Sequence, residues 1–353
     1  MLAHFGLSTG PQRAPARIGH PAQVELHDLA KHGVVSTADA TALGLGPSDL
    51  RRLVKAGTVR RLIRGWYAVC PPGAERPPWE GADSFESARR QHRLLVAALL
   101  RSFAGRAVAS HHSALVLHDV EVWRSDLGVA QLCRSEDDHS RHRPAAMLHP
   151  AVGLPPVLAP SGLRTVPLAT AVVQVGLRPP ARGVAPLPLE SLVAADNALH
   201  QGLVTTEELA AAIRAHAGAP GIPGVRSLLA HADGRHESVG ESRLAHTMRV
   251  LGYRFTPQIP VTFLGRKWRV DFELDDHPVA IEFDGLAKYA GGVANPTPEQ
   301  LRQALAREKW REDRLRDSGR EVVRFIWSEA DDARLVRARI NEAILRARRR
   351  RSA

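Results

Sequence analysis

The sequence has little cysteine and no long apolar run, and each shortage excludes a class of protein. Its 353 residues include two cysteines, Cys70 and Cys133, which lie too far apart to form a metal-binding or redox motif. So few cysteines are typical of a reducing cytoplasm, where we expect the protein to be located. The longest apolar run, residues 94–100, is much shorter than the roughly 20 residues that a membrane-spanning helix needs. The first 21 residues lack the apolar segment of a signal peptide and predict a loose leader.

Acidic residues are too few to balance the basic ones. The chain has 48 Lys and Arg against 37 Asp and Glu, which gives a formal net charge of +11 and a pI near 10.6. A chain this basic favours a polyanionic partner, and nucleic acid is the first candidate. We therefore expect double-stranded DNA as the partner, because no feature of the sequence supports a membrane.

The chain is too long for one ordinary core, so we expect several domains. We find no internal repeat, and stretches rich in Pro and Gly divide the chain at 71–81, 150–162 and 178–188. The predicted fold class is α/β, multidomain. The predicted order is a leader (1–21), a winged-helix DNA-binding domain (22–70), a linker (71–84), a mostly helical middle region (85–235) and a C-terminal domain (236–353).

Residues 22–70 predict three helices followed by a β-hairpin. The third helix, within GPSDLRRLVKAG, has Pro47 near its first position, and Leu50, Leu53 and Val54 form an apolar stripe along it. The basic residues off this stripe and on the hairpin are Arg51, Arg52, Lys55, Arg60, Arg61 and Arg64. Three helices and a basic hairpin are typical of a winged helix, whose third helix usually enters the major groove. We therefore predict that these residues bind DNA; the alternative is a basic face that is merely solvated.

The same stretch, from GVVSTADATALGLG to the closing RGWY, resembles the N-terminal winged helix of the AbiEi family of type IV antitoxins. The resemblance implies DNA binding, with autoregulation as an expected role. It leaves a toxin partner undetermined.

The middle region is less informative. Residues 108–123 contain His111, His112 and His118, and imidazole is a common zinc ligand. No cysteine pair or HExxH spacing accompanies them, so we favour structural or solvated histidines over a zinc site. The phrase ASHHSALVLH also resembles the second segment of AbiEi-type proteins. We expect a mostly helical connector with a few strands.

The C-terminal region has the clearest periodicities. GESRLAHTMRVLGYRF predicts a helix with Glu241 in its first turn, and QIPVTFL, WRVDFEL and VAIEFDG predict three strands. A long helix over 297–319, a buried strand EVVRFIW and a basic terminal helix follow. The predicted order is α-β-β-β-α-β, then α.

Two of these strands carry a cluster of acids. The acidic residues of WRVDFEL and of VAIEFDG are Asp271, Glu273, Glu282 and Asp284. If residues 275–278 form a hairpin loop, then Phe272 faces Ile281, and Val270 faces Phe283. Apolar pairing thus fixes a register for the two strands.

That register places Asp271 opposite Glu282. Like charges directly opposite each other are destabilising, so such carboxylates share a proton or bind a cation. A divalent ion such as Mg²⁺, held by one or two carboxylates with water and phosphate, fits this arrangement. The alternative is a solvated acidic face in which Arg269 forms an ordinary salt bridge with Asp284.

The order of elements and these acids together resemble the PD-(D/E)xK nuclease superfamily, and most closely the very-short-patch-repair endonuclease-like domains often fused to AbiEi-type N-termini. The matching residues are GES at 240–242, Gln258, VDF at 270–272, IEFDG at 281–285, KY at 288–289 and EKWRED at 308–313. The resemblance implies an αβββαβ restriction-endonuclease-like core and metal-dependent hydrolysis of phosphodiester bonds.

The resemblance also implies roles for single residues. Asp271 would be the central ligand of Mg²⁺ or Mn²⁺ and Glu282 the second, while Glu241 would bind the metal directly or through water. Gln258 and Asp284 would support the site.

The lysine of the family pattern is missing. The family has lysine two residues after the second acid, where this chain has Asp284. A catalytic lysine, needed near the attacking water, would then be Lys288 or Lys309, and Lys288 is slightly favoured. The leading hypothesis is a DNA-binding protein with a Mg²⁺-dependent endonuclease-like domain. The alternative is a transcriptional regulator or antitoxin-like protein whose nuclease fold is inactive. A pure interaction module fits the basic charge less well.

Overall fold

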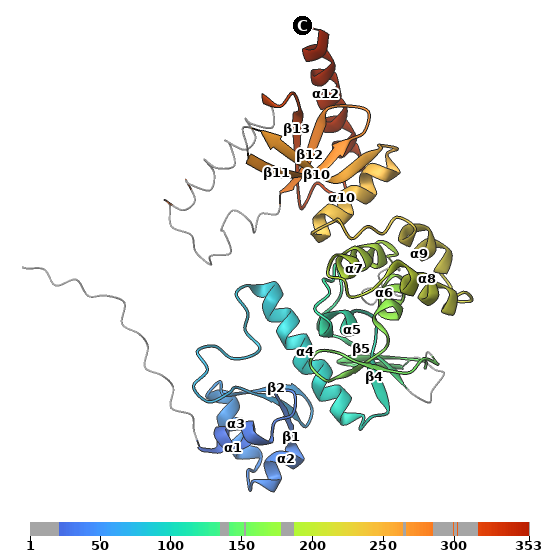
Figure 1. Ribbon diagram of the computed structural model, residues 1–353. Helices are drawn as coiled ribbons and strands as arrows, with labels where there is room; N and C mark the ends of the chain where they lie inside the picture. Colours follow the sequence, from blue (N-terminus) through green and yellow to red (C-terminus); the bar gives the residue numbers. More distant parts are fainter. Residues whose placement is uncertain are drawn as a thin grey trace, which may run out of the picture. The chain divides into compact units, whose positions relative to one another are not determined.

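A computed structural model describes residues 21–134, 141–151, 153–177, 187–263, 266–284, 299, 302 and 317–352 (Figure 1). The chain divides into two compact units, Met1–Ala107 with Leu127–Ala130 and Val108–Asp126 with Gln131–Ala353. The finer domain boundaries expected from the sequence are not tested by this division and stay a prediction.

The first unit begins with three helices and a three-stranded sheet. Its elements are α1 (Pro21–Leu29), β1 (Val34–Ser36), α2 (Thr37–Ala42), α3 (Pro47–Lys55), β2 (Val59–Ile63) and β3 (Trp66–Val69), with strand order β1-β3-β2. Local capping fixes the helix starts. Ser36 and Asp39 form a capping box at α2, and Pro47 begins α3. The core contains Leu50 and Leu53, both 2% exposed, whereas Val54, predicted to share their stripe, is 38% exposed and lies outside the core.

A long helix, α4 (Ser84–Ser102), completes the first unit. Its Arg101 donates to the Val34 carbonyl and pairs with Asp39 at 3.1 Å. The Arg101 guanidinium also lies over the Trp66 ring, 4.9 Å from its centroid. These contacts join the helix to β1, α2 and β3.

The following part of the chain combines helices with short strands. The helices are α5 (His111–Leu117), α6 (Leu168–Leu177), α7 (Leu189–His200), α8 (Thr206–Ala215) and α9 (Ile222–Leu229). The strands are β4 (Ala107–Ala109), β5 (Ala130–Arg134), β6 (Arg141–Arg143), β7 (Ala146–His149), β8 (Val157–Leu158) and β9 (Arg164–Thr165), in the order β6-β7-β5-β4-β9-β8. Helices predominate as predicted, but the sheet is larger than expected. Strands of this length are too short for alternation to reveal them in a sequence.

Among the described residues, the C-terminal part of the second unit contains a four-stranded sheet with the helices α10 and α12 beside it (Figure 1). Its elements are α10 (Val239–Val250), β10 (Phe255–Phe263), β11 (Arg266–Leu274), β12 (Val279–Asp284), β13 (Glu321–Ile326) and α12 (Ala333–Ser352). The strand order is β10-β11-β12-β13, antiparallel except for the parallel pair β12–β13. The helix predicted over 297–319 falls mostly outside the described residues.

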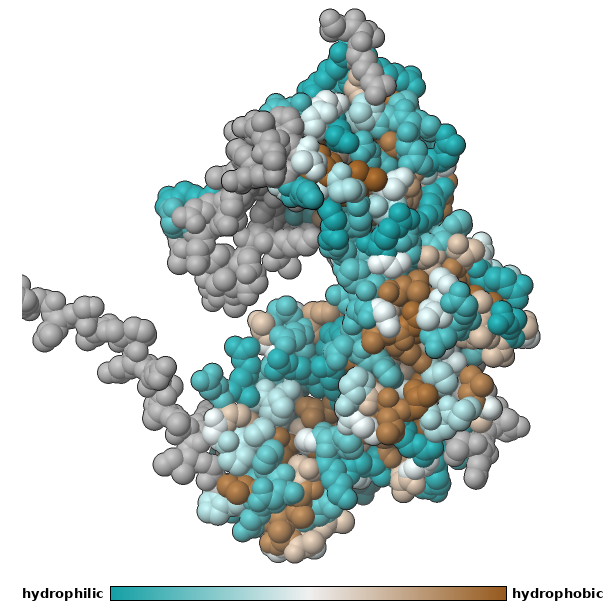
Figure 2. Space-filling view, in the orientation of Figure 1, coloured by the Kyte–Doolittle hydropathy of each residue, from teal (hydrophilic) through white to brown (hydrophobic). Residues whose placement is uncertain are grey.

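One face of this sheet packs on both helices. Phe272, Ile281 and Phe325 form a buried cluster with Met248 of α10 and Ile340 of α12. Helix α10 approaches β12 closely because residue 240 is glycine, and a Cβ there would lie 1.9 Å from Cε1 of Phe283. A smaller apolar cluster contains Val261, Val270, Ala280 and Val322. In Figure 2 this part of the molecule is mainly hydrophilic on the visible face, whereas apolar residues gather over the α6–α9 part.

Candidate functional site

The predicted register of the acidic strands is confirmed at the two pairs that the ladder forms. Phe272 pairs with Ile281, and Glu273 with Ala280. The paired positions end there, one residue short of Asp271 and Glu282. The acids therefore lie on adjacent strands, as the apolar pairing indicated.

The neighbouring strands extend this arrangement into a row across the sheet. On β10, Gln258 lies between residues 257 and 259, which pair with Phe272 and Val270, so Gln258 is placed opposite Asp271. On β13, Arg324 pairs in parallel register with Glu282. We call Gln258, Asp271, Glu282 and Arg324 the polar row.

The sheet is irregular at the polar row. Gln258 has φ of 56°, a left-handed conformation that residues other than glycine rarely adopt. The Phe283 backbone N–H donates to Oδ2 of Asp271 at 2.7 Å. Val270 lies in the smaller apolar cluster, not in the larger one with Phe283. The predicted Val270–Phe283 pair is therefore wrong, because the two residues lie in different apolar clusters.

Arg324 is the functional candidate that sequence reasoning missed. Its Nη2 lies 3.2 Å from Oε2 of Glu282, and the two side chains are 19% and 6% exposed. The Arg324 guanidinium offsets part of the cost of burying the Glu282 carboxylate. The signal in the sequence was an arginine inside the otherwise apolar strand EVVRFI. The sequence alone could not show that this strand lies beside Glu282.

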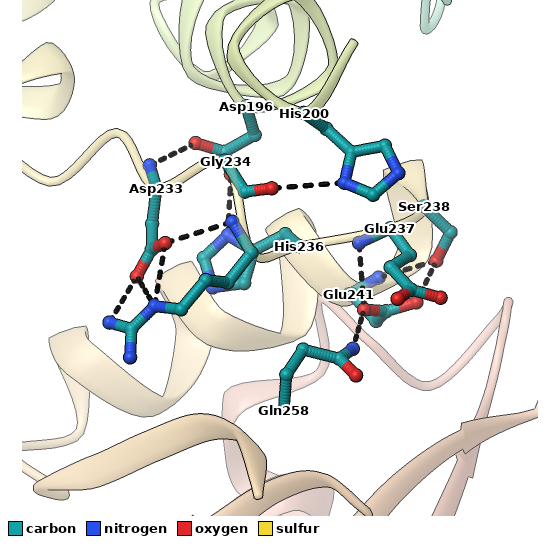
Figure 3. A network of polar contacts seen from close by, with 10 residues as sticks. Asp196, His200, Asp233, Gly234, His236, Glu237, Ser238, Glu241 and Gln258 are labelled. Atoms are coloured by element: carbon teal, nitrogen blue, oxygen red, sulfur yellow. Dashed lines mark hydrogen bonds and ion pairs between the residues drawn. The ribbon is translucent and has the colours of Figure 1, made fainter. Parts of the chain in front are cut away.

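Glu241 lies on the first turn of α10 and accepts hydrogen bonds from three donors (Figure 3). Its carboxylate accepts from the Glu237 backbone N–H at 2.9 Å, from the Ser238 hydroxyl at 2.8 Å and from Gln258 Nε2 at 3.0 Å. Ser238 also caps the helix. The structure thus brings Glu241 to Gln258, and through it to the polar row, and both of its carboxylate oxygens already accept hydrogen bonds.

A second polar network lies next to Glu241 and joins α7 to the segment before α10 (Figure 3). The fully buried side chains of Asp196 and His236 meet at 2.7 Å, and Asp196 also accepts from the Asp233 N–H at 2.8 Å. In the same segment Glu237 pairs with Arg269, which the sequence had placed opposite Asp284. These contacts fix the position of α10 relative to α7.

A metal site is not preassembled in the described part of the chain. No three His, Cys, Asp or Glu side chains there form a group that could hold a metal ion. Asp271 and Glu282 remain as two carboxylates on adjacent strands. Lys288 and Lys309, the predicted catalytic lysines, lie outside the described residues, so their role stays a prediction.

The histidines of the middle region are mostly buried. His111 and His112 are 4% and 3% exposed. His118 is half-buried, and burial lowers its pKa.

The predicted DNA-binding side chains project from the first unit. Arg51, Arg52 and Lys55 of α3 are exposed, while Leu50 and Leu53 on the opposite side of the helix are buried. Arg52 pairs with Asp49 at 2.8 Å.

The basic residues of the hairpin are exposed as well. Arg60 and Arg61 lie on β2 and Arg64 in the turn before β3. Arg60 donates to Gln91 of α4 at 3.0 Å. Helix α3 and the hairpin thus present basic side chains from two successive elements.

One comparison with known proteins, the match to a family model, supports this N-terminal assignment. The family described as a transcriptional regulator, AbiEi antitoxin, matches residues 24–69. Two uncharacterized proteins of Mycobacterium tuberculosis, MT2308 and Rv2248, are each 29% identical over 290 residues, which cover 81% of this chain and 92% of theirs. The crystal structure of the RV2827C protein from Mycobacterium tuberculosis is 18% identical with a TM-score of 0.37, over 70% of this chain and 87% of that one. The family match confirms the predicted AbiEi antitoxin-like domain for residues 24–69.

The described helices do not include a candidate membrane span. Within the described ranges, no helix is both long enough and apolar enough to cross a membrane.

Proposed function

Because residues 24–69 match an AbiEi antitoxin-like regulator domain, we propose that the protein is a transcriptional regulator that binds duplex DNA through α3 and the β2–β3 hairpin. The observation that carries this proposal is the division of α3 into two sides. Leu50 and Leu53 anchor one side in the core, and Arg51, Arg52 and Lys55 are exposed on the other. Such a helix can lie in the major groove while its basic side chains contact phosphates and base edges.

Substituting Arg51, Arg52 and Lys55 together with alanine is expected to weaken duplex binding by on the order of tenfold or more, because three positive charges leave the contact surface. Fluorescence anisotropy with labelled duplex DNA would measure the affinity. The control replaces Arg143, Arg214 and Arg226, three exposed arginines of the second unit, and should bind like the wild type. Equal losses in both variants would show that only total charge matters and would reject α3 as the reading helix.

A second candidate function, metal-dependent hydrolysis of phosphodiester bonds, is favoured by the polar row. Mg²⁺ commonly uses one or two protein carboxylates together with water and phosphate oxygens, so Asp271 and Glu282 fit it on donor chemistry. When bound, the metal would polarise the phosphate and lower the pKa of a water ligand. This candidate rests on the resemblance of the C-terminal domain to PD-(D/E)xK nucleases.

The protein's own residues would orient that site. The Phe283 N–H holds one oxygen of Asp271, and Arg324 holds one oxygen of Glu282. Gln258 connects the polar row to Glu241 by a hydrogen bond. Glu241 would therefore help to orient the site through Gln258. Asp284 stands where the family has lysine, and an inactive nuclease fold that only binds DNA is the matching alternative.

Plasmid nicking distinguishes the two. With Mg²⁺ or Mn²⁺, the nuclease hypothesis expects nicking of supercoiled DNA that is lost in Asp271→Ala and in Glu282→Ala. Asp276→Asn removes an exposed acid from the loop between the same strands and should retain activity. Absence of metal-dependent nicking, or nicking that survives both alanine substitutions, would leave DNA binding as the only function of this domain.

A further inference from the structure

The second unit contains a histidine-lined cavity that neither proposed function uses. Its volume is about 290 Å³, close to the lower end of the range for small-ligand pockets. The lining residues come from α5, β5, β7, α6 and the segment after α8. They are His111, Cys133, His149, Pro150, Ala151, Gln174, Leu177, His216, Ala219 and Pro220. The cavity thus gathers polar side chains that are far apart in the sequence.

The polar side chains of this cavity are held in place within the fold. The rings of His111 and His149 stack with centroids 4.0 Å apart, and the two residues are 4% and 3% exposed. Gln131 Oε1 lies 2.5 Å from Nε2 of His149. Gln174 is 5% exposed, and its Oε1 accepts a hydrogen bond from the backbone N–H of His111 at 3.3 Å.

The backbone at His111 is strained. Its φ is 49°, in the left-handed region that favours glycine, although it begins α5. Such conformations cost about 1–3 kcal/mol and cluster at functional sites. The strain is retained at a residue whose side chain lines the cavity.

Two lining residues have hydrogen-bonding capacity that the described structure does not use. Gln174 Nε2 carries two hydrogens, and its one acceptor is the weak Cys133 sulfur at 3.9 Å. His216 Nδ1 donates to the Ala212 carbonyl at 2.8 Å, which leaves Nε2 for another partner. This Nε2 accepts in the neutral ring, and an anion bound there would favour the imidazolium form, in which both ring nitrogens donate.

The lining chemistry selects the ligand. Among the described residues around the cavity there is no carboxylate, and no three side chains there form a group that could hold a metal ion. Imidazole and amide donors suit an anion, while Pro150, Leu177 and Pro220 offer apolar surface. We propose that this cavity binds a small organic anion, in which a carboxylate or phosphate contacts Gln174 and His216 and a compact apolar body fills the rest.

Titration calorimetry on the full chain tests this proposal with benzoate, phenyl phosphate and the neutral benzamide. At least one charged probe should bind about tenfold or more tightly than benzamide, because the charge-assisted bonds are absent from the neutral probe. Which charged probe binds more tightly identifies the headgroup. No binding of either charged probe, or equal binding of benzamide, overturns the proposal.

Two variants separate the cavity from nonspecific binding. His216→Ala is expected to weaken binding of the charged probe by about tenfold. Ala219→Trp should block binding, because the larger side chain fills the cavity without removing a polar group. His200→Ala is the matched control, since His200 Nδ1 also bonds a carbonyl, that of Gly234 at 3.0 Å, but does not line the cavity. Wild-type affinity in both Ala219→Trp and His216→Ala would overturn the proposal, as would an equal loss in His200→Ala.

Discussion

Replacing Gly240 with alanine is expected to lower the free energy of unfolding of the second unit by about 2–3 kcal/mol. A Cβ at this position would lie 1.9 Å and 2.0 Å from Cε1 and Cζ of Phe283. The ring cannot move away without cost, because Phe283 belongs to the larger apolar cluster of the sheet and lies edge-on to Trp327. The helix cannot easily move either, since Ser238 and Glu241 fix its first turn. Calorimetric or urea unfolding would measure the loss.

The matched control for this substitution is Gly218→Ala. A Cβ at residue 218 meets no atom within 4 Å, so the stability of the Gly218→Ala variant should stay close to that of the wild type. Combining Gly240→Ala with Phe283→Leu should cost less than the sum of the two single substitutions, because the smaller side chain relieves the overlap. A stable Gly240→Ala protein would contradict the close packing of α10 on β12.

Replacing Glu190 with glutamine is expected to stabilise the protein at pH 8 but to have little effect near pH 4. Burial raises the pKa of Glu190 from 4.5 to about 8, against the opposing effects of Arg124 and Ser125. The folded protein therefore keeps a proton that the unfolded chain releases above pH 4.5. Stability is lost progressively as the pH rises from about 4.5 to about 8, by on the order of a few kcal/mol in total.

Glutamine imitates the protonated carboxyl, so the variant should lack this decline. Urea unfolding at several pH values between 5 and 8 would show the difference. Glu207→Gln is the control, because Glu207 is exposed and its lowered pKa keeps it ionised throughout this range. Parallel stability profiles for wild type and Glu190→Gln would mean that Glu190 is ionised in the folded protein.

The sequence predicts those parts of the structure that depend on local patterns. Helical periodicity, Pro47 near the start of the third helix and the basic hairpin are enough to indicate the winged helix. Apolar alternation was enough to predict the pairing of Phe272 with Ile281, which brings Asp271 and Glu282 onto adjacent strands. These predictions need only neighbouring residues or a short hairpin.

The rest depends on interactions between distant segments. Arg324 meets Glu282 through a parallel strand pair, which requires a long crossover whose geometry is not encoded locally. The left-handed backbone at Gln258 and the hydrogen bond from the Phe283 N–H to the Asp271 side chain make the sheet irregular, which apolar patterning cannot show. The histidine-lined cavity likewise joins His111, Cys133 and His149 from separate strands and helices.

The salt dependence of duplex binding tests the central claim, DNA binding by α3, most directly. Affinity would be measured over a range of salt concentrations for the wild type and for the variant lacking the charges of Arg51, Arg52 and Lys55. If these side chains neutralise phosphates, the slope of log K against log salt should become shallower by about 0.9 for each phosphate that the variant no longer neutralises. An unchanged slope and an unchanged affinity would show that α3 does not bind DNA.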